Sequence, residues 1–317
     1  MPKIVSIGEI LVEIMSTKIN QTFLSTGFFE GPFPSGAPAI FADSAAKMGG
    51  DVGVISSVGN DDFGELNIRR LKQDKVDTSR IKILSKQTTG TAFVTYFDSG
   101  ERQFIFHFGA AGHLSFDTDD KEYLRSSEYL HIMGCTLLSN ENNRNAVLNA
   151  ARYSKENGIL ISFDPNIRPE LLAGSDASNV FEEILNLTDI LLTGKEEIKS
   201  ISGTCDVVKG ALTKMFDKST KIIVIKNGRE NVELYTKEQY YVCETRDYGE
   251  MADQTGAGDC FDGAFIAALS QNYSLENALL MASTAGSVSV TKKGPMEGTS
   301  DLDYVKNLIA RKLSITI

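Results

Sequence analysis

Short apolar runs alternate with longer helical patterns along most of this chain, and this alternation limits the folds that it can adopt. The run KIVSIG at residues 3–8 ends in glycine, and VGVISSVG stands at 52–59. Apolar residues recur at helical spacing at 37–49 and again at 62–76. The alternation predicts βαβ units and a mostly parallel sheet covered by helices on both faces. It continues in apolar runs at 129–134, 159–166, 189–194 and 221–228 and in helical patterns near 142–157, 205–217, 258–271, 275–291 and 302–313.

Two stretches interrupt this rhythm. Residues 91–97 and 102–108 are apolar runs that flank DSGE, a turn signal, and they predict a β-hairpin with no helix nearby. Residues 9–34 also lack a helical pattern. We therefore expect these stretches to form a small accessory sheet beside the main layer.

The composition favours a folded intracellular protein. Apolar residues make up 42% and charged residues 23% of the 317 positions, which is enough apolar material for a large core. The net charge of −10 disfavours nucleic acid or an anionic membrane as a partner. No run approaches the ~20 apolar residues of a membrane helix, and the N-terminus lacks a leader pattern. The spacing of the four cysteines and three histidines is not typical of a metal site, and we expect a cytoplasmic location.

The stretch DQTGAGDCFDGAF, residues 253–265, carries the clearest chemical signal. Gly256, Ala257 and Gly258 stand where a loop enters a helix, so their backbone N–H groups can face a bound anion together. Asp259, in the first helical turn, can accept a proton from an attacking hydroxyl beside that anion hole. The plainer alternative is that Asp259 only stabilises the helix dipole and that the glycines only turn the chain.

Two other classes of function were weighed. A dinucleotide oxidoreductase needs G-x-G-x-x-G after the first strand, and KIVSIGEILVE does not supply it. A non-catalytic sugar sensor on the same scaffold is expected to lose the acid or the glycines, whereas both are intact here. Phosphoryl transfer to an alcohol therefore remains the leading interpretation.

The motifs follow one another in an order that resembles the ribokinase (PfkB-type) family of carbohydrate kinases. They are GEILVE (8–13), SGAPAIFADSAAKMGG (35–50), VGNDDFG (58–64), FDPNIRPEL (163–171), KEE (195–197), VIKNG (224–228) and DQTGAGD (253–259). The resemblance implies a three-layer αβα sandwich with a mostly parallel central sheet and a small β-sheet lid. It also implies a single kinase domain over 1–317, with lid segments at about 9–34 and 88–112. The expected activity is the phosphorylation of a sugar hydroxyl with ATP and Mg²⁺.

The resemblance assigns roles on the catalytic and substrate side. Asp259 matches the catalytic base, the backbone of residues 256–258 the anion hole, and Arg168 a phosphate and substrate contact. Glu13 stands where the family holds sugar hydroxyls with an acid, usually Asp, while Ile40 replaces a common sugar-binding Asn. The predicted substrate-binding residues are Glu13, Gly36, His107, Asn166, Arg168 and Asp259.

The nucleotide side is assigned in the same way. In the family's N-x-x-E element Gly194 replaces Asn, and Glu197 keeps the acid that acts on Mg²⁺ through water. Asp253 resembles a position near the nucleotide and a monovalent-cation loop, so K⁺ is a further expected ligand. The predicted cofactor-binding residues are Glu197, Lys226, Gly228, Asp253, Gly256, Gly258, Gly286 and Gly294.

The sugar itself is less constrained. GPFPSGAPAIF, at residues 31–41, looks most like the tagatose kinases, a ketohexose-specific branch, so we expect tagatose ahead of fructose. Sugar-acid kinases such as 2-keto-3-deoxygluconate kinase commonly carry Arg in the second hairpin strand, where His107 stands here. A histidine is a poor fixed counter-charge at pH 7, which favours a neutral sugar. A sugar acid is the alternative, and ribose and nucleosides follow. The apolar alternation in FVTYF and FIFHF fits either a homodimer through the lid sheet or closure of the lid over the sugar.

Overall fold

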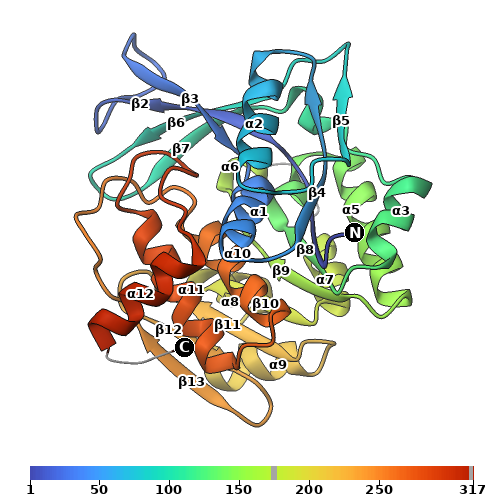
Figure 1. Cartoon of the computed structure of the whole chain (residues 1–317), viewed down its shortest axis with the longest axis vertical. Helices are drawn as coiled ribbons and strands as arrows, with labels where there is room; N and C mark the ends of the chain where they lie inside the picture. The colour runs from blue at the N-terminus through green and yellow to red at the C-terminus, as the bar shows by residue number, and fades with distance from the viewer. Residues whose placement is uncertain (173–176, 314–316) are drawn as a thin grey trace.

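A nine-stranded, mostly parallel sheet forms the centre of the protein, as the alternation predicted (Figure 1). The computed structural model describes residues 1–172, 177–313 and 317. The strand order is β13-β12-β11-β10-β9-β8-β1-β4-β5, and every neighbouring pair from β11 to β5 is parallel. The strands are β1 (Ile4–Ile7), β4 (Val52–Gly59), β5 (Ile81–Leu84), β8 (Tyr129–Met133), β9 (Leu160–Asp164), β10 (Ile190–Gly194), β11 (Ile222–Lys226), β12 (Asn231–Tyr235) and β13 (Tyr240–Glu244).

Helices cover both faces of the sheet and bury two separate apolar cores. Alternate side chains of one strand enter different cores, because successive residues of a strand point to opposite faces. Ile4 joins the first core, whereas Val5 and Ile7 join the second. The first face carries α1 (Ala37–Lys47), α2 (Asp62–Gln73), α10 (Ala257–Ser270), α11 (Leu275–Ser289) and α12 (Leu302–Leu313). The second carries α3 (Thr118–Arg125), α4 (Gly134–Ser139), α5 (Glu141–Glu156), α7 (Ala177–Leu187), α8 (Lys195–Ser202) and α9 (Leu212–Phe216).

Two features differ from the sequence prediction. The helix expected near 205–217 is a π turn, η2 (Val207–Ala211), followed by the short α9. The strands β12 and β13 form an antiparallel hairpin that extends the sheet beyond β11, and the sequence analysis did not predict it. Exposure alternates along both strands, and in β12 polar residues alternate with apolar ones, because the hairpin lies at the sheet edge and is only half buried.

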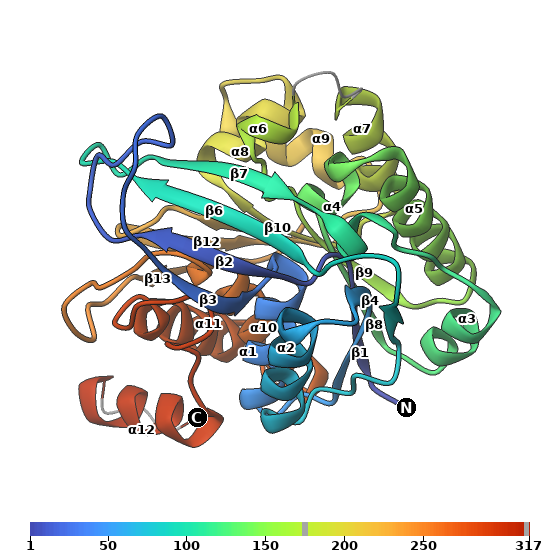
Figure 2. The ribbon, with the colours of Figure 1, turned by 90° about the horizontal axis from the view of Figure 1, so that it is seen from above.

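The accessory sheet forms a lid with its own small core. Its order is β3-β2-β6-β7, and it lies as a layer of its own beside the central sheet (Figure 2). Leu11, Met15, Ala92, Val94 and Phe104 are buried on its inner side. The lid strands are β2 (Leu11–Ser16), β3 (Phe29–Ser35), β6 (Gly90–Tyr96) and β7 (Arg102–His107), and the short helices η1 (Gly109–Gly112) and α6 (Pro169–Leu172) lie beside them in the chain or in space.

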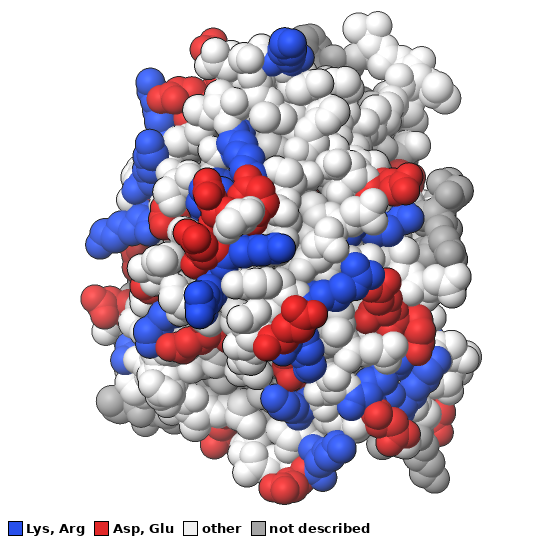
Figure 3. Space-filling view, turned by 90° about the vertical axis from the view of Figure 1, so that its right-hand side faces the viewer, with Lys and Arg blue, Asp and Glu red and all other residues white. Residues whose placement is uncertain are grey.

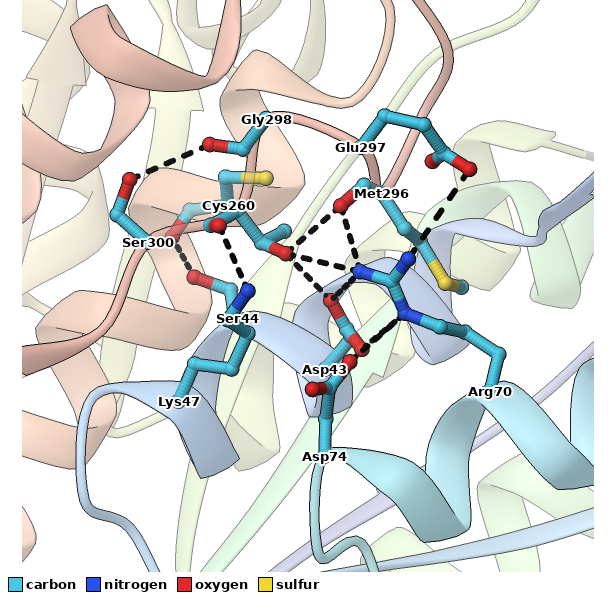
Figure 4. A network of polar contacts seen from close by, with 11 residues as sticks. Asp43, Ser44, Lys47, Arg70, Asp74, Cys260, Met296, Glu297, Gly298 and Ser300 are labelled. Carbon is cyan, nitrogen blue, oxygen red and sulfur yellow. Dashed lines mark hydrogen bonds and ion pairs between the residues drawn. The ribbon is translucent and has the colours of Figure 1, made fainter.

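A buried polar network braces the first face of the molecule (Figure 4). Arg70 of α2 donates through Nη2 to the Met296 carbonyl at 2.7 Å and pairs with the Asp43 carboxylate of α1 at 3.2 Å. Thr299 donates to the same carboxylate at 2.7 Å. The network therefore fixes α1, α2 and the segment after α11 to one another, and α1 and that segment both border the site described below.

The exposed surface mixes both signs of charge. On the face in Figure 3, lysine and arginine side chains are interspersed with aspartate and glutamate, so this face has no broad basic field for a polyanion. Within residues 1–172, 177–313 and 317, no helix combines the length and the apolar character needed to cross a bilayer.

Candidate active site

The parallel strands end along one edge of the sheet, and that edge gathers the predicted residues. Glu9 follows β1 and Cys135 follows β8, while Asp164 ends β9, Gly194 ends β10 and Lys226 ends β11. Ligands of open parallel sheets bind outside these carboxyl ends. Residues 253–259, the motif loop, enter α10 at the same edge, and the lid sheet covers it.

Gly256 shapes the motif loop. It caps α10 at a φ of 78°, and a Cβ atom added there would lie 2.7 Å from the Pro295 carbonyl oxygen. Only glycine fits that combination of left-handed backbone and close approach. The turn starts α10 at Ala257, and the first N–H groups of a helix lack partners within it, so this helix end is suitable for an anion.

Asp259 lies one turn into α10 and is only 4% exposed. Asn166, from the segment after β9, donates through Nδ2 to Asp259 Oδ1 at 2.9 Å. Burial raises the pKa of Asp259 to about 6, although the nearby Arg168 charge opposes that rise. A carboxylate with this pKa is ionised at neutral pH and can still accept a proton, which suits a general base.

A small enclosed space, the lid pocket, lies between the lid and the motif loop and measures about 40 Å³. Glu13 accepts a hydrogen bond from Ser35 Oγ at 2.7 Å through Oε1, while its Oε2 has no partner in the structure. Asn166 Oδ1 is also buried without a partner. These two acceptors are suited to hydroxyl donors, because buried polar atoms rarely stay unpaired. The lining is Glu9, Leu11, Glu13, Gly36, Ala37, Ile40, Arg102, Phe104, Phe106, Phe108, Cys135, Asn166, Arg168, Leu171, Thr255, Gly256 and Asp259.

Gly36, Glu9 and Glu13 border the lid pocket and make close contacts with their neighbours. Gly36 has a φ of 109°, and a Cβ there would lie 2.4 Å from the Glu9 carbonyl oxygen. Burial raises the pKa of Glu9, whose carboxylate accepts hydrogen bonds from Cys135 and Thr136. Burial also raises the pKa of Glu13, to about 7, against the hydrogen bond from Ser35.

Two arginines and one phenylalanine form the upper wall of the lid pocket. The guanidinium carbons of Arg102 and Arg168 lie 5.7 Å and 5.6 Å from the centre of the Phe104 ring. The sequence analysis did not select Arg102. It shares a strand face with Phe104 and Phe106, and this alternation in RQFIFHF was the signal that could have found it.

His107 is not brought to the lid pocket. It is exposed and lies on the opposite face of β7, with Gln103 and Ile105. The period of two along a strand explains the difference, since residues 102, 104 and 106 face inward and residues 103, 105 and 107 face outward. The position compared with the sugar-acid kinases therefore makes no contact with the pocket, and the arginine that does is five residues earlier.

A second space, the bridge cavity, measures about 180 Å³ and connects with the lid pocket through shared residues. Lys226 lies at its base, with Nζ 2.9 Å from both Asp164 Oδ2 and Asp262 Oδ1. Asp262 was missed, although an acid three residues after Asp259 inside an apolar helix was a visible signal. The lining is Arg102, Asp164, Asn166, Arg168, Gly194, Glu197, Lys226, Gln254, Gly256, Ala257, Gly258 and Asp259.

Glu197 supports the bridge cavity from α8. Its carboxylate accepts the backbone N–H groups of Ile167 at 2.9 Å and Gly194 at 2.8 Å. Burial raises its pKa, and Asp164 adds to the rise. Among the described residues no cluster of three or more His, Cys, Asp or Glu could hold a metal directly. The pair Asp164 and Glu197 fits Mg²⁺ held through water and phosphate oxygens, which is how this ion commonly binds.

A third space, the outer pocket, is open and measures about 250 Å³. Gly228 and Gly286, two of the predicted cofactor-binding residues, border it, and so do Ala257 and Gly258 of the motif loop. Asp253 and Gly294 do not. The Asp253 carboxylate accepts the Thr255 and Gly294 N–H groups at 2.9 and 3.1 Å and so braces the motif loop. The remaining lining is Lys226, Arg229, Val232, Thr245, Arg246, Asp247, Tyr248, Gly249, Met251, Gln254, Phe261, Ser283, Ser287 and Val290.

Known proteins resemble the chain over nearly its whole length. A protein named probable fructokinase-5, from Arabidopsis thaliana, is 31% identical over 92% of this chain and 93% of its own. The fructokinase of Klebsiella pneumoniae is 31% identical over 83% of this chain and 87% of its own. An E. coli protein provisionally named Ribokinase II, solved with ATP and Mg²⁺, is 40% identical, with a TM-score of 0.90 over 98% of this chain and 100% of its own.

The family assignment follows from these matches. Residues 1–302 match the description "pfkB family carbohydrate kinase", which covers the sheet, the lid and the motif loop together. The E. coli relative was solved with ATP and Mg²⁺ and has the same fold as this chain. The chain belongs to the pfkB family of carbohydrate kinases and is an ATP-dependent sugar kinase.

Proposed function

We propose that this kinase transfers the γ-phosphoryl group of ATP to the terminal primary hydroxyl of a ketohexose, tagatose or fructose. The sugar occupies the lid pocket, the nucleotide base and ribose occupy the outer pocket, and the phosphates lie in the bridge cavity. The observation that carries the proposal is the pair of unpartnered acceptors, Glu13 Oε2 and Asn166 Oδ1, next to Asp259. Relatives named fructokinase support a ketohexose.

The residues divide the chemistry among them. Asp259 accepts the proton of the attacking hydroxyl, because it is the carboxylate that borders both the lid pocket and the bridge cavity. The first N–H groups of α10 and the Arg168 guanidinium stabilise the charge on the transferred group. Mg²⁺ would be held by water-bridged Glu197 and Asp164 and would offset the phosphate charge.

A sugar acid, 2-keto-3-deoxygluconate, is the second candidate, and one observation favours it. Arg102 borders the lid pocket from the lid strand β7, where it can pair with a carboxylate. Arg102 forms no ion pair with the described residues. Among the acids, the buried Glu13 has the largest electrostatic effect on it. The absence of a lid arginine was the reason to favour a neutral sugar, so that reason no longer applies.

Release of ADP over a substrate panel tests both candidates. The panel holds tagatose, fructose, 2-keto-3-deoxygluconate, ribose and adenosine with Mg-ATP, and Asp259→Asn serves as the blank. The highest kcat/KM for tagatose or fructose supports the ketohexose. The highest value for the sugar acid replaces it with the second candidate, and no turnover with any member rejects both.

Arg102→Gln and His107→Gln form a matched pair for the same question. Both remove a basic side chain from β7, but only Arg102 faces the lid pocket. If the sugar acid is the substrate, Arg102→Gln raises its KM about tenfold or more and His107→Gln leaves it unchanged. With a neutral ketohexose, Arg102→Gln changes KM far less.

Two further expectations remain proposals. The outer face of the lid exposes Phe93 by 38% and Ile105 by 50%, which supports a homodimer through this sheet. Light scattering of the wild type and of a Phe93→Glu, Ile105→Glu double variant tests it, since only the wild type is expected to have the mass of a dimer.

The monovalent cation predicted near Asp253 has its own test. Activity is measured in K⁺ and in choline, and a higher activity in K⁺ supports the cation.

A further inference from the structure

Three polar contacts join the lid to the motif loop across long stretches of sequence. Tyr96, at the end of β6, has its hydroxyl 3.1 Å from Thr255 Oγ1 and 3.5 Å from Asp253 Oδ1. Gln254 donates through Nε2 to the carbonyl oxygen of Gly100, at the turn between β6 and β7, at 3.0 Å. The hairpin that covers the lid pocket is thus held by three consecutive residues of the catalytic motif.

Gln254 is the residue of this group that also faces the ligand spaces. Its side chain borders the outer pocket and the bridge cavity, and it borders the space beneath the hairpin turn together with Arg102 and Arg168. Asp253 and Thr255 on either side are buried and bonded to each other. The loop backbone is therefore fixed while the Gln254 side chain lies exposed between the nucleotide side and the lid.

The lid pocket has little free space in this conformation. Its volume of about 40 Å³ is far below the ~300 Å³ at which ligand pockets typically begin. A sugar can enter only if the hairpin moves away from the sheet edge. That movement separates the Gly100 carbonyl from Gln254, because the acceptor lies on the hairpin and the donor on the motif loop.

We propose that Gln254 is a positioning residue that couples nucleotide binding to closure of the lid hairpin. A nucleotide in the outer pocket and bridge cavity restricts the Gln254 side chain to the orientation in which its amide reaches Gly100. Closure is then favoured when the phosphate donor is present. The inference rests on the proposed assignment of the cavities, but it does not depend on which sugar the enzyme uses.

Hydrogen exchange at residues 97–101 tests the coupling without any sugar. The protein is measured with and without Mg²⁺ and the non-hydrolysable ATP analogue AMP-PNP. In the wild type we expect AMP-PNP to slow exchange at the hairpin turn about threefold to tenfold, the range of one net hydrogen bond. In Gln254→Glu this slowing is expected to disappear, because a carboxylate of the same size cannot donate to the Gly100 carbonyl.

Gln103→Glu is the matched control. It introduces the same change on the same hairpin, but Gln103 is exposed on the outer face of β7. This variant is expected to keep the wild-type response to AMP-PNP. Equal protection by AMP-PNP in the wild type and Gln254→Glu would overturn the proposal, as would equal loss in both variants or no protection in the wild type.

A second variant separates the coupling from nucleotide affinity. Tyr96→Phe removes the hydroxyl next to Thr255 and leaves every atom of the outer pocket in place. It is expected to speed exchange at the turn both with and without AMP-PNP, while the slowing caused by AMP-PNP is kept and the Kd changes less than twofold. In Gln254→Glu the Kd is expected to rise only by the factor of protection that is lost, because coupling is reciprocal. A Kd that rises far beyond that factor would show a damaged nucleotide site and would overturn the coupling. Failure of the substrate panel leaves this readout unaffected, so the two proposals fail separately.

Discussion

The lid pocket and the outer pocket border the same motif loop but differ in volume and in the residues that line them. The lid pocket is small, at about 40 Å³, and is lined by the buried carboxylates Glu13 and Asp259 and the half-buried Arg102 and Arg168. The outer pocket is larger and more open, at about 250 Å³, and glycine backbone and apolar side chains border it together with the charged Lys226, Arg229, Arg246 and Asp247. We therefore expect the lid pocket to hold its ligand mainly by fixed polar atoms and the outer pocket mainly by shape.

The difference predicts where substitutions cost most. An unpaired polar atom in a dry, enclosed site loses its full hydrogen bond, whereas an open site replaces a lost contact with water. Changes in the lid pocket should therefore have larger effects than changes in the outer pocket. A single substitution in one pocket should also leave the Michaelis constant of the other ligand nearly unchanged.

The largest effect is expected from Asp259→Asn. The amide keeps the size of the side chain and can still accept the bond from Asn166, but it cannot take up a proton. We expect kcat to fall about 100- to 10,000-fold, the usual contribution of a general base. Calorimetry should give an unchanged Kd for AMP-PNP, and turnover near the wild-type value would reject Asp259 as the base.

Glu13→Gln should have the next largest effect, and only on the sugar. Glutamine keeps one oxygen for Ser35 but places an NH₂ group where Oε2 now accepts. The KM of the sugar is expected to rise about tenfold to a hundredfold, as for a lost bond to a charged acceptor, with the KM of ATP unchanged. Glu122→Gln, on the exposed face of α3, is the control. Equal changes in both Michaelis constants would contradict the separation of the pockets.

The pH dependence gives a smaller effect with a definite sign. Burial raises the pKa of Asp259 to about 6, so protonation below that pH removes the base form. We expect kcat/KM to fall about tenfold per pH unit from pH 7 to pH 6, as Glu13, whose pKa is raised to about 7, takes up a proton, and more steeply below pH 6, where Asp259 is protonated as well. In Glu13→Gln the shallower part above pH 6 should vanish. A flat profile between pH 5 and 8 would exclude both groups.

Much of the central fold and the site floor could be predicted from sequence. The apolar runs and helical patterns locate the parallel strands, and the carboxyl ends of those strands then have to lie together. The turn at the motif loop was also predictable, because the sequence places Gly-Ala-Gly directly before a helical pattern. In the structure Gly256 has a positive φ and lies close to the Pro295 carbonyl, so glycine is required there. These features depend on local pattern, which the sequence contains directly.

The lid wall was harder to predict because it depends on strand register. Arg102 and His107 are both basic residues of β7, but they lie on opposite faces of the strand. An error of one residue in the register would exchange the two faces. The contacts of Gln254 and Tyr96 join segments more than 150 residues apart, and no local pattern predicts them. The floor of the lid pocket thus follows from the strand order, whereas its wall depends on which face of β7 each side chain takes.

The smallest expected effect lies in the outer pocket, at Gly286→Ala. A Cβ atom there would meet the Ala257 carbonyl oxygen at 3.2 Å and Phe261 Cβ at 3.3 Å, so α10 and α11 must separate slightly. Because the pocket is open, the KM of ATP should rise only about threefold to tenfold, at the low end of overpacking costs. Alanine also favours the helix over glycine by about 1 kcal/mol, so Tm should not fall. A raised KM for ATP with an unchanged sugar KM and Tm would assign the effect to nucleotide fit, whereas a change as large as that of Glu13→Gln would end the contrast between an enclosed polar pocket and an open one.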